Sequence, residues 1–582
     1  MKTKFPAALC AAAFAFVPLT RAADAAPPDA VFFGGKIVTV DGAFRLADAM
    51  AIRGERIVAL GAKDEVLRLA QPGRTQLHDL RGKVVLPGLI DSHVHPFAAW
   101  VEHDHPIPTM ESVHDILDYF AARAKVVPPG RWLRLTQVFI TRLREQRYPT
   151  RAELDRVAPE HPVFFGTGPD AVLNTLALRR SGIDRDFKVT DGGPGKMETD
   201  ASGEPTGLLR NLTRFVKVET TERTPTGAEF RAAVKTLFAD YQRNGLTAVG
   251  DRLSNDQLLA LYQDLLAHDE LGVRVAASYG LPTVGPMAGI FEVIDRVAQH
   301  PLRRESPRLR LIGTKILLDG GMLTGSAYLK QPWGVSRIYG IDDPAYRGVL
   351  NLPPDRLYAM VERVAQHGLQ FTAHVQGDAA IDTLAAAYAR LDRVQPVRPL
   401  RHSFTHASFM TPEAIREIAR LGAVADLQPI WLYSDARTLV TQFGYDRLRH
   451  FIPLKSLFEA GAIVGGGTEH MQKIGAHRAI NAYNPFLGMW VALTRRAKWY
   501  EGQLHPEEAL TRRQALEFYT RNNAYLLFWE KEIGSLEAGK RADFIVVDRD
   551  PLECPIDDLK DTRVLETWMD GKRVFALDPA SR

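Results

Sequence analysis

Apolar and polar positions between residues 85 and 470 follow a repeating pattern that predicts parallel β-strands separated by helices. Helical periodicity occupies most of the gaps, as at residues 355–366 and 379–391. We expect strands at apolar runs that end in polar residues, namely 86–95, 246–251, 273–278, 311–319, 370–374, 402–406, 423–428 and 463–468. Eight strands alternating with helices are typical of an α/β fold of the TIM-like (β/α)8 barrel type, whose chemistry lies at the carboxyl ends of the strands.

Both ends of the chain are β-rich instead. Residues 30–40, 49–60, 542–548 and 564–575 are rich in β-branched and aromatic side chains and are interrupted by glycine. We therefore expect one small β-sandwich domain built from both termini. Its two parts are assigned to residues 26–84 and to residues 511–582, the second part including a helix.

The barrel domain is then expected over residues 85–510. Between its first two strands, residues 97–244 are too long for a single crossover, so an insertion that covers the barrel mouth is expected there. Within it the pattern predicts helices at 112–124 and 151–157, a strand at 162–165 and a turn region rich in glycine and proline at 191–207.

Residues 1–25 have the pattern of a secretory signal peptide. Lys2 and Lys4 precede a short apolar run, and small residues that suit cleavage follow it. The run is too short for a permanent membrane helix. Cleavage would leave Cys554 as the single cysteine, which precludes an internal disulfide. We expect a periplasmic or secreted protein, with a disordered tail on a cytoplasmic protein as the alternative.

The length and charge of the chain limit its domain organisation and the classes of molecule that it is expected to bind. A chain of 582 residues is expected to form two or more domains. Its 73 Lys and Arg residues nearly balance 69 Asp and Glu residues without a basic block, which argues against nucleic-acid binding. A small-molecule substrate without stable membrane insertion is expected, and a homo-oligomer stays open.

The first predicted barrel strand ends in a candidate metal half-site. Side chains alternate along a strand, so Asp91, His93 and His95 share one face. Two imidazoles two residues apart at a strand mouth suit a zinc ion. An isolated pair of this kind is also compatible with ordinary core or surface histidines.

Further polar residues stand at the ends of later strands. Lys315 interrupts an apolar run, where a charged amine is costly unless it is paired or neutral. His374 ends the fifth strand and His406 ends the sixth, while Glu469 follows the eighth. Each could be structural by itself, but in a barrel all of them would converge on one point.

Several motifs together resemble the amidohydrolase superfamily, and specifically the family 3 branch that contains N-substituted formamide deformylase. The similarity extends over nearly all of the chain after residue 25. Its marks are Leu86-Pro-Gly-Leu-Ile-Asp-Ser-His-Val-His95, Lys315-Ile-Leu-Leu-Asp-Gly320, Ala373-His-Val-Gln-Gly-Asp378, Thr405-His-Ala407, Gln428-Pro429, Asn484-Pro485 and Gly534-Ser-Leu-Glu-Ala-Gly-Lys-Arg-Ala-Asp543.

The resemblance implies a distorted β/α barrel with a metal centre of one or two divalent ions, zinc first, with iron, manganese or nickel as alternatives. His93 and His95 would bind one ion, and His374 and His406 would complete a second site. Lys315 would carry a CO2-derived carbamate that bridges two metals. Glu469, in the place of the family's last-strand acid, would bind metal and handle the proton of the attacking water.

The chain departs from the family pattern near this centre. Glu469 stands where aspartate is usual, and its extra methylene displaces the carboxylate, which in an active site can cost about a hundredfold in rate. His470 beside it is an extra candidate ligand. These and other changes predict a substrate pocket unlike that of the named relative. Its candidate lining residues are His103, His105, Arg210, Tyr328 and Trp431.

The leading hypothesis is a metal-dependent hydrolase that acts on carbon–nitrogen bonds other than peptide bonds. The substrate would be an amide or cyclic amide, with Glu469 and Lys315 as catalytic residues. A metal-dependent lyase or isomerase on the same centre, or a non-catalytic binding protein with a degenerate site, stays open.

Overall fold

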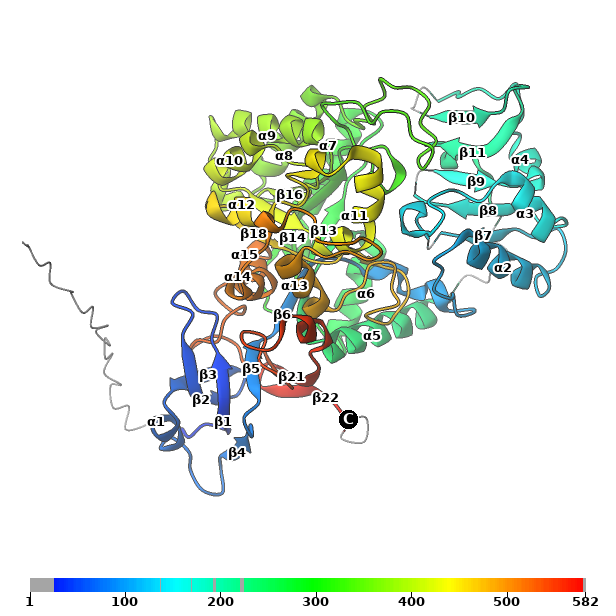
Figure 1. Cartoon of the computed structure of the whole chain (residues 1–582). Helices are drawn as coiled ribbons and strands as arrows, with labels where there is room; N and C mark the ends of the chain where they lie inside the picture. Colours follow the sequence, from blue (N-terminus) through cyan, green and yellow to red (C-terminus); the bar gives the residue numbers. More distant parts are fainter. Residues whose placement is uncertain (1–25, 137, 169, 192–194, 220–224, 579–582) are drawn as a thin grey trace, which may run out of the picture.

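The computed structural model describes residues 26–578 except 137, 169, 192–194 and 220–224. The signal peptide predicted over residues 1–25 lies outside the described residues. Figure 1 shows a central barrel with a five-stranded sheet on one side and a second sheet, built from both ends of the chain, on another.

The barrel sheet has nine strands in the order β18-β17-β16-β15-β14-β13-β12-β6-β19, and all of its neighbours are parallel. Its last segment, β19, pairs with its first strand, β6, so the sheet curls into a TIM-like barrel. The predicted barrel fold is thus confirmed. The strands are β6 (Leu89–His95), β12 (Leu246–Ser254), β13 (Arg274–Gly280), β14 (Leu309–Leu317), β15 (Gln370–Val375), β16 (Ser403–His406), β17 (Val424–Leu427), β18 (Ile463–Gly466) and β19 (His470–Met471).

The first predicted strand, 86–95, is divided between two sheets. β5 (Val84–Pro87) pairs with strands of the terminal sheet, and β6 begins only at Leu89. Gly88 lies between them, and a Cβ atom there would come within 2.3 Å of Thr247 Oγ1. The Leu-Pro-Gly-Leu segment is therefore the crossing from one sheet to the other, and the single-strand prediction is wrong at this point.

Amphipathic helices pack around the barrel sheet, including α8 and α9 where the periodicity predicts them. In α10 the apolar residues Ile415, Ile418 and Leu421 face inward. The side chain of Thr411 caps its first turn, and Gly422 ends it in the left-handed conformation. The outer helices are α5 (Gly227–Arg243), α6 (Asp256–Ala267), α7 (Met287–Ala298), α8 (Pro354–Gln366), α9 (Asp378–Asp392), α10 (Pro412–Leu421), α11 (Pro429–Phe443), α12 (Leu454–Glu459) and α13 (Pro485–Thr494).

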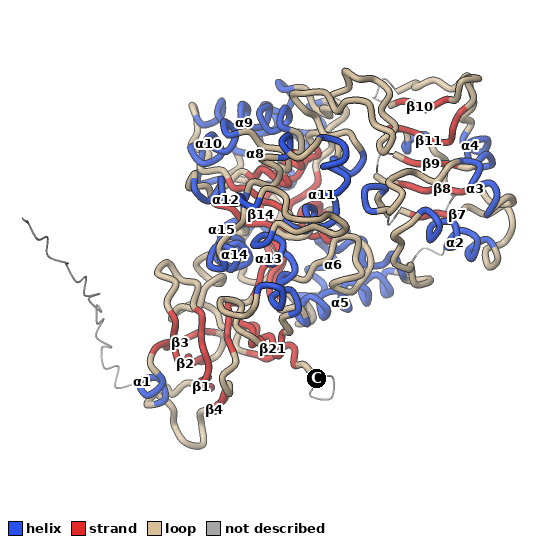
Figure 2. Tube along the Cα trace, viewed as in Figure 1, coloured by secondary structure: helices blue, strands red, loops and turns tan. Residues whose placement is uncertain are grey.

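The two ends of the chain form one mixed sheet, separate from the barrel (Figure 2). Its strand order is β22-β21-β20-β5-β1-β2-β3, and β4 pairs with β1. Phe32, Phe544 and Trp568 pack together across the segments and join the two termini in one core. The strands are β1 (Ala30–Val38), β2 (Leu46–Arg53), β3 (Arg56–Gly61), β4 (Gln76–Asp79), β5, β20 (Phe544–Val547), β21 (Val564–Met569) and β22 (Lys572–Ala576).

The insertion after β6 has its own five-stranded sheet, in the order β10-β11-β9-β8-β7. The predicted turn region at 191–207 also contains the strands of a hairpin, β10 and β11, so that assignment was incomplete. The strands are β7 (Leu133–Leu135), β8 (Val163–Gly166), β9 (Ala171–Leu173), β10 (Lys196–Thr199) and β11 (Pro205–Arg210), with helices α2 (Val113–Ala124), α3 (Arg151–Val157) and α4 (Thr175–Ser181). None of the helices in the described part of the chain combines the length and apolar character that a membrane span requires.

Candidate metal centre

Six polar side chains meet at the carboxyl ends of the barrel strands. His93 and His95 come from β6, Lys315 from β14, His374 from β15 and His406 from β16, and Glu469 immediately precedes β19. The parallel strands end at one rim of the barrel, which brings together residues that are far apart in the sequence.

The tightest group within this set is formed by His93, His406 and Glu469. One ligand atom from each lies within 4.8 Å of the others. Glu469 Oε1 is 3.6 Å from His406 Nε2 and 3.9 Å from His95 Nε2. Two further pairs of rings are in contact: the His93 and His95 Nε2 atoms are 3.3 Å apart, and the His374 and His406 ring centres are 4.6 Å apart.

Several atoms of the six side chains at the strand ends are buried without a hydrogen-bond partner among the described residues. They include His406 Nε2, Glu469 Oε2 and Lys315 Nζ. A buried polar atom without a partner is costly, and a divalent metal ion is one partner that neutral imidazole and carboxylate satisfy. The donor set and its burial therefore fit a metal ion.

Neighbouring polar groups fix the orientation of His406. Its Nδ1 atom donates to Gln428 Oε1 at 2.7 Å, which leaves Nε2 facing Glu469. The indole of Trp431 stacks on the same ring, with centres 4.5 Å apart and planes inclined by 19°. A hydrogen bond to the second ring nitrogen is the usual way in which a ligating imidazole is held.

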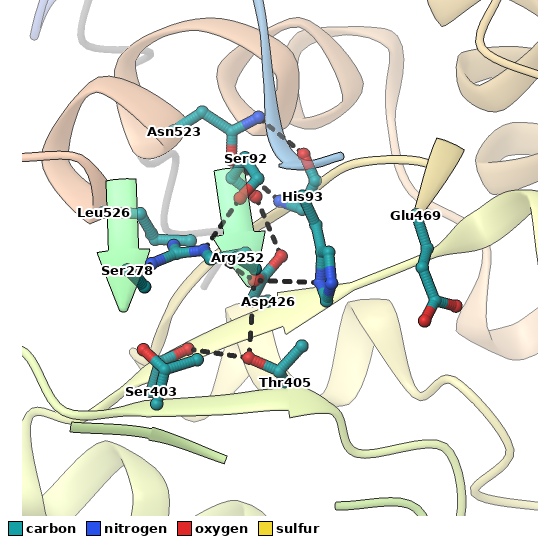
Figure 3. Close-up of polar contacts among 12 residues, drawn as sticks. Ser92, His93, Arg252, Ser278, Ser403, Thr405, Asp426, Glu469, Asn523 and Leu526 are labelled. Carbon is teal, nitrogen blue, oxygen red and sulfur yellow. Dashed lines mark hydrogen bonds and ion pairs between the residues drawn. The ribbon is translucent and has the colours of Figure 1, made fainter. Parts of the chain in front are cut away.

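Asp426, on β17, lies behind His93 at the centre of a buried polar network (Figure 3). Its Oδ2 is 3.6 Å from His93 Nδ1 and 3.5 Å from Arg252 Nε, and its Oδ1 accepts a hydrogen bond from Ser92 Oγ at 2.8 Å. Asp426 and Arg252 are both fully buried. Asp426 was not among the predicted site residues, although an acid inside the apolar run 423–428 is the same signal that singled out Lys315.

Burial favours the uncharged forms of His93, His374, His406 and Lys315 by lowering their pKa values. It lowers the pKa values of His93 and His406 well below the ordinary 6.5, and burial together with Lys315 lowers that of His374 to about 3. Burial also lowers the pKa of Lys315 to about 7, against the opposing influence of Asp426 and Glu469. Metal ligation requires neutral imidazole, which is the form that burial favours here.

The backbone of Glu469 is unusual for a residue with a side chain. Its φ of 51° lies in the left-handed region. Its N–H donates to the His93 carbonyl at 2.8 Å, and its own carbonyl accepts from Asn481 Nδ2 at 2.6 Å. The neighbouring His470, an extra candidate ligand in the sequence, is turned away. Its Nδ1 bonds the Tyr241 hydroxyl at 2.6 Å, and its Nε2 lies 2.9 Å from two backbone carbonyls.

A cavity of about 720 Å³ opens beside the centre, with His374 and Glu469 in its wall. Arg210 and Trp431, two predicted pocket residues, also line it. Arg210 comes from the insertion and pairs with Asp170, Nη1 to Oδ2 at 2.9 Å. The cavity is therefore walled by both the barrel and the insertion.

The other predicted pocket residues lie elsewhere. Tyr328, His103 and His105 are not among the residues that line this cavity. His103 Nδ1 is 2.9 Å from the Trp100 carbonyl, and His105 Nε2 is 2.8 Å from the Tyr119 hydroxyl. These local partners turn both imidazoles toward the insertion's own residues.

Similarity to known proteins extends over nearly the whole chain. A family model described as "Amidohydrolase family" matches residues 76–575. The chain is 28% identical over 560 residues to N-substituted formamide deformylase of Arthrobacter pascens, covering 93% of this chain and 97% of that protein.

Solved structures with the same fold include two metal-dependent hydrolases of Pyrococcus. The P. horikoshii structure aligns with a TM-score of 0.66 at 21% identity, covering 91% of this chain and 99% of the other. The P. furiosus structure aligns with a TM-score of 0.64 at 22% identity, covering 90% and 100%. At this identity the likeness establishes the fold.

Proposed function

The chain belongs to the amidohydrolase family, and from this we propose that it is a metal-dependent hydrolase of carbon–nitrogen bonds. The substrate would be a small organic amide or cyclic amide. The observation that carries the proposal is the buried group of His93, His406 and Glu469, whose ligand atoms lie within 4.8 Å of one another beside a cavity.

His93, His95, His374, His406 and Glu469 would hold one or two divalent ions, with zinc as the first candidate and iron, manganese or nickel as alternatives. Lys315 would take part as a CO2-derived carbamate, for which its lowered pKa of about 7 provides the reactive neutral amine. A divalent metal bound here would supply Lewis acidity, which lowers the pKa of a ligated water to roughly 7 and polarises a carbonyl.

The chain's own residues supply the proton transfers. Glu469 would take a proton from the attacking water, and its Oε2 atom, which has no hydrogen-bond partner among the described residues, supports this role. The same carboxyl group would then return the proton to the leaving nitrogen, as general acid–base catalysis requires. Gln428 and Trp431 hold the His406 ring in place beside it.

The cavity supports a small and largely apolar substrate. Its volume of about 720 Å³ lies within the range of small-molecule pockets, roughly 300 to 1,000 Å³. Phe139, Leu323, Ile341 and Trp431 contribute apolar surface to its wall. N-substituted formamides are the first compounds to test, because the relative from A. pascens is named for their deformylation.

The proposal is tested on the purified full-length chain by metal analysis and by hydrolysis of N-alkyl and N-aryl formamides and of cyclic amides. We expect bound metal, loss of hydrolysis after chelation, and recovery with zinc, iron, manganese or nickel. Glu469→Gln should abolish turnover while metal stays bound. As a matched control, Glu459→Gln at the end of α12 should change neither.

Oxygen labelling separates hydrolysis from the alternatives. In H2¹⁸O, a hydrolase places one labelled oxygen in the acid product. A metal-dependent product without the label would favour a lyase or isomerase. A chain with no bound metal, and no turnover after metal addition, would instead be the non-catalytic binding protein. ¹³C NMR in labelled bicarbonate tests the Lys315 carbamate separately.

We also propose a periplasmic or secreted location for the enzyme, based on the signal-like pattern of residues 1–25. N-terminal sequencing of the mature chain after export tests this. A mature chain that begins at residue 1 and stays in the cytoplasm would contradict it.

A further inference from the structure

The backbone at Glu469 is held in a conformation that most side chains avoid. Its φ is 51°, and residues 472 and 473 also have positive φ values, 58° and 49°. A non-glycine residue stays in the left-handed region only where the surrounding structure enforces it. Around Glu469 two hydrogen bonds do so, one to its N–H and one to its carbonyl.

The bond to the carbonyl comes from Asn481, a fully buried residue in the segment before α13. Asn481 Nδ2 donates to the Glu469 carbonyl at 2.6 Å, and Asn481 Oδ1 accepts from Arg142 Nη1 at 2.8 Å. Because one partner is an acceptor and the other a donor, the amide has only one orientation that satisfies both.

Arg142 is itself rigidly anchored. Its Nε and Nη2 bind Asp435 of α11 at 3.1 and 2.9 Å, and its Nη1 also donates to the Ile480 carbonyl at 2.6 Å. Arg142 belongs to the insertion, in the short 3-10 helix Ile140–Arg142. A continuous chain of bonds therefore runs from the insertion through Asn481 to the backbone of Glu469.

We propose that Asn481 is a positioning residue that holds Glu469 in its left-handed conformation and so sets the place of its carboxylate, with Arg142 fixing the Asn481 amide. The proposal rests on the proposed role of Glu469 as acid–base residue and ligand. The proposal explains how a glutamate can serve at a position where the family pattern has the shorter aspartate. With the backbone in the left-handed conformation, Glu469 Oε1 lies 3.6 Å from His406 Nε2 and 3.9 Å from His95 Nε2.

Loss of the Asn481 bond should release this arrangement. The Glu469 carbonyl would become a buried acceptor without its partner, so rotation of the peptide toward an extended conformation would be favoured. The carboxylate would then move, and displacements of about 1 Å in an active site can cost about a hundredfold in rate.

The test uses Asn481→Asp and Asn481→Ala in the full-length chain, each also made in a Glu469→Gln background. Asn481→Asp is nearly isosteric and keeps an oxygen for Arg142, yet lacks the N–H that reaches Glu469. Asn484→Ala is the matched control. Asn484 is buried in the same segment and caps α13, so its loss is structural.

Two solution measurements follow. For the metal-depleted protein titrated with zinc alone, we expect Kd to rise about 10- to 100-fold in either Asn481 variant, the range typical of residues that orient a metal ligand. On a formamide that the wild type hydrolyses, kcat should fall by a similar factor with KM within about twofold. The Asn484→Ala control should leave both unchanged.

The background variant distinguishes positioning from general damage. If Asn481 acts through Glu469, its loss adds nothing to the effect of Glu469→Gln on zinc affinity, which stays measurable in a variant without turnover. An equal effect in both backgrounds, or no effect in the wild-type background, would overturn the proposal.

A crystal structure of Asn481→Asp decides the question without metal or substrate. The proposal requires that residue 469 leave the left-handed region or that its carboxylate withdraw from His406. An unchanged Glu469 overturns it. A wild type that binds no zinc and hydrolyses no amide would contradict the proposed function alone, and the variant structure would still decide the role of Asn481.

Discussion

Replacement of Asp426 by asparagine would remove one negative charge from the middle of the barrel without changing the size of the side chain. Asp426 is fully buried and lies within 3.6 Å of His93 Nδ1 and 3.5 Å of Arg252 Nε. Its charge also opposes the lowering of the Lys315 pKa. The substitution therefore leaves the Arg252 charge without its nearest carboxylate and His93 without the anion behind its ring.

The expected loss of stability follows from the distance to Arg252. Two unit charges 3.5 Å apart attract by about 5 kcal/mol at an effective dielectric constant of roughly 20. Burial raises the pKa of Asp426, so desolvation offsets part of this attraction. Removal of one member of a buried ion pair typically costs about 3–5 kcal/mol. We expect the free energy of unfolding to fall by about 3–5 kcal/mol.

The same substitution should weaken metal binding. A carboxylate behind a ligating imidazole orients the ring and raises its basicity, and its loss typically costs about 10- to 100-fold in affinity. This corresponds to about 1.4–2.7 kcal/mol in the free energy of zinc binding. His93 should thus lose affinity even though its own side chain is unchanged.

Urea unfolding of the metal-free chain and zinc titration against a chromogenic chelator measure the two effects. Asp543→Asn is the matched control, because Asp543 forms a buried ion pair with Arg274 away from the centre, Nε to Oδ2 at 2.7 Å. The control should lose stability and keep its zinc affinity. The reasoning is refuted if Asp426→Asn weakens zinc binding no more than the control does, or if it costs less than about 1 kcal/mol of stability.

Three further predictions follow from the same geometry. Glu469→Asp should keep its bound metal, but its kcat should fall about a hundredfold, because the shorter side chain leaves the carboxylate farther from His406 if the backbone is unchanged. A kcat equal to that of the wild type at equal metal content would contradict this. Zinc at 1,000 times its Kd should stabilise the metal-free chain by about 4 kcal/mol in calorimetry, since it binds only the folded state, and no change in Tm on chelation would exclude a resident metal. Burial lowers the pKa of His402 from 6.5 to about 3, so the unfolded chain binds more protons between these values, and the stability present above pH 6.5 is lost as the pH falls toward 3. In His402→Gln, the glutamine side chain can still accept a hydrogen bond from the Phe371 N–H. Between pH 4 and 7 the free energy of unfolding, measured by urea unfolding, should therefore depend less on pH than in the wild type, by an amount that corresponds to about one proton taken up on unfolding. A pH dependence as large as that of the wild type would disprove the assignment.

The barrel was predictable because its strands are short apolar runs with polar ends, and burial on both faces imposes that pattern. The division at Gly88 was not. Val84 to Ile90 are apolar on both sides of the break, and only the strand pairing in the structure shows that the glycine separates two sheets. Likewise, β10 and β11 are partly exposed, so the density of glycine and proline concealed the hairpin.

The residues that meet at the centre were predictable to different degrees. His93, His95, Lys315, His374 and His406 stand at strand ends, where a polar residue after an apolar run is visible in the sequence itself. Asp426 carries the same signal within a recognised strand and could have been found by the argument applied to Lys315. Asn481 carries none, because it lies in an irregular segment and its importance comes only from what it touches.

Glu469, which stands where the family pattern has aspartate, shows why a residue such as Asn481 cannot be predicted from the sequence. A comparison of side-chain lengths alone predicts a misplaced carboxylate for glutamate, because it assumes that aspartate and glutamate would have the same backbone conformation at position 469. The structure has instead a backbone turned to a φ of 51°, which sets the point from which the longer side chain starts. That turn is held by the His93 carbonyl, which is far away in the sequence, and by Asn481, which lies in an irregular segment 12 residues later. Glu469 and Asn481 therefore act as one unit, and the effect of either residue on the site can be judged only together with the other.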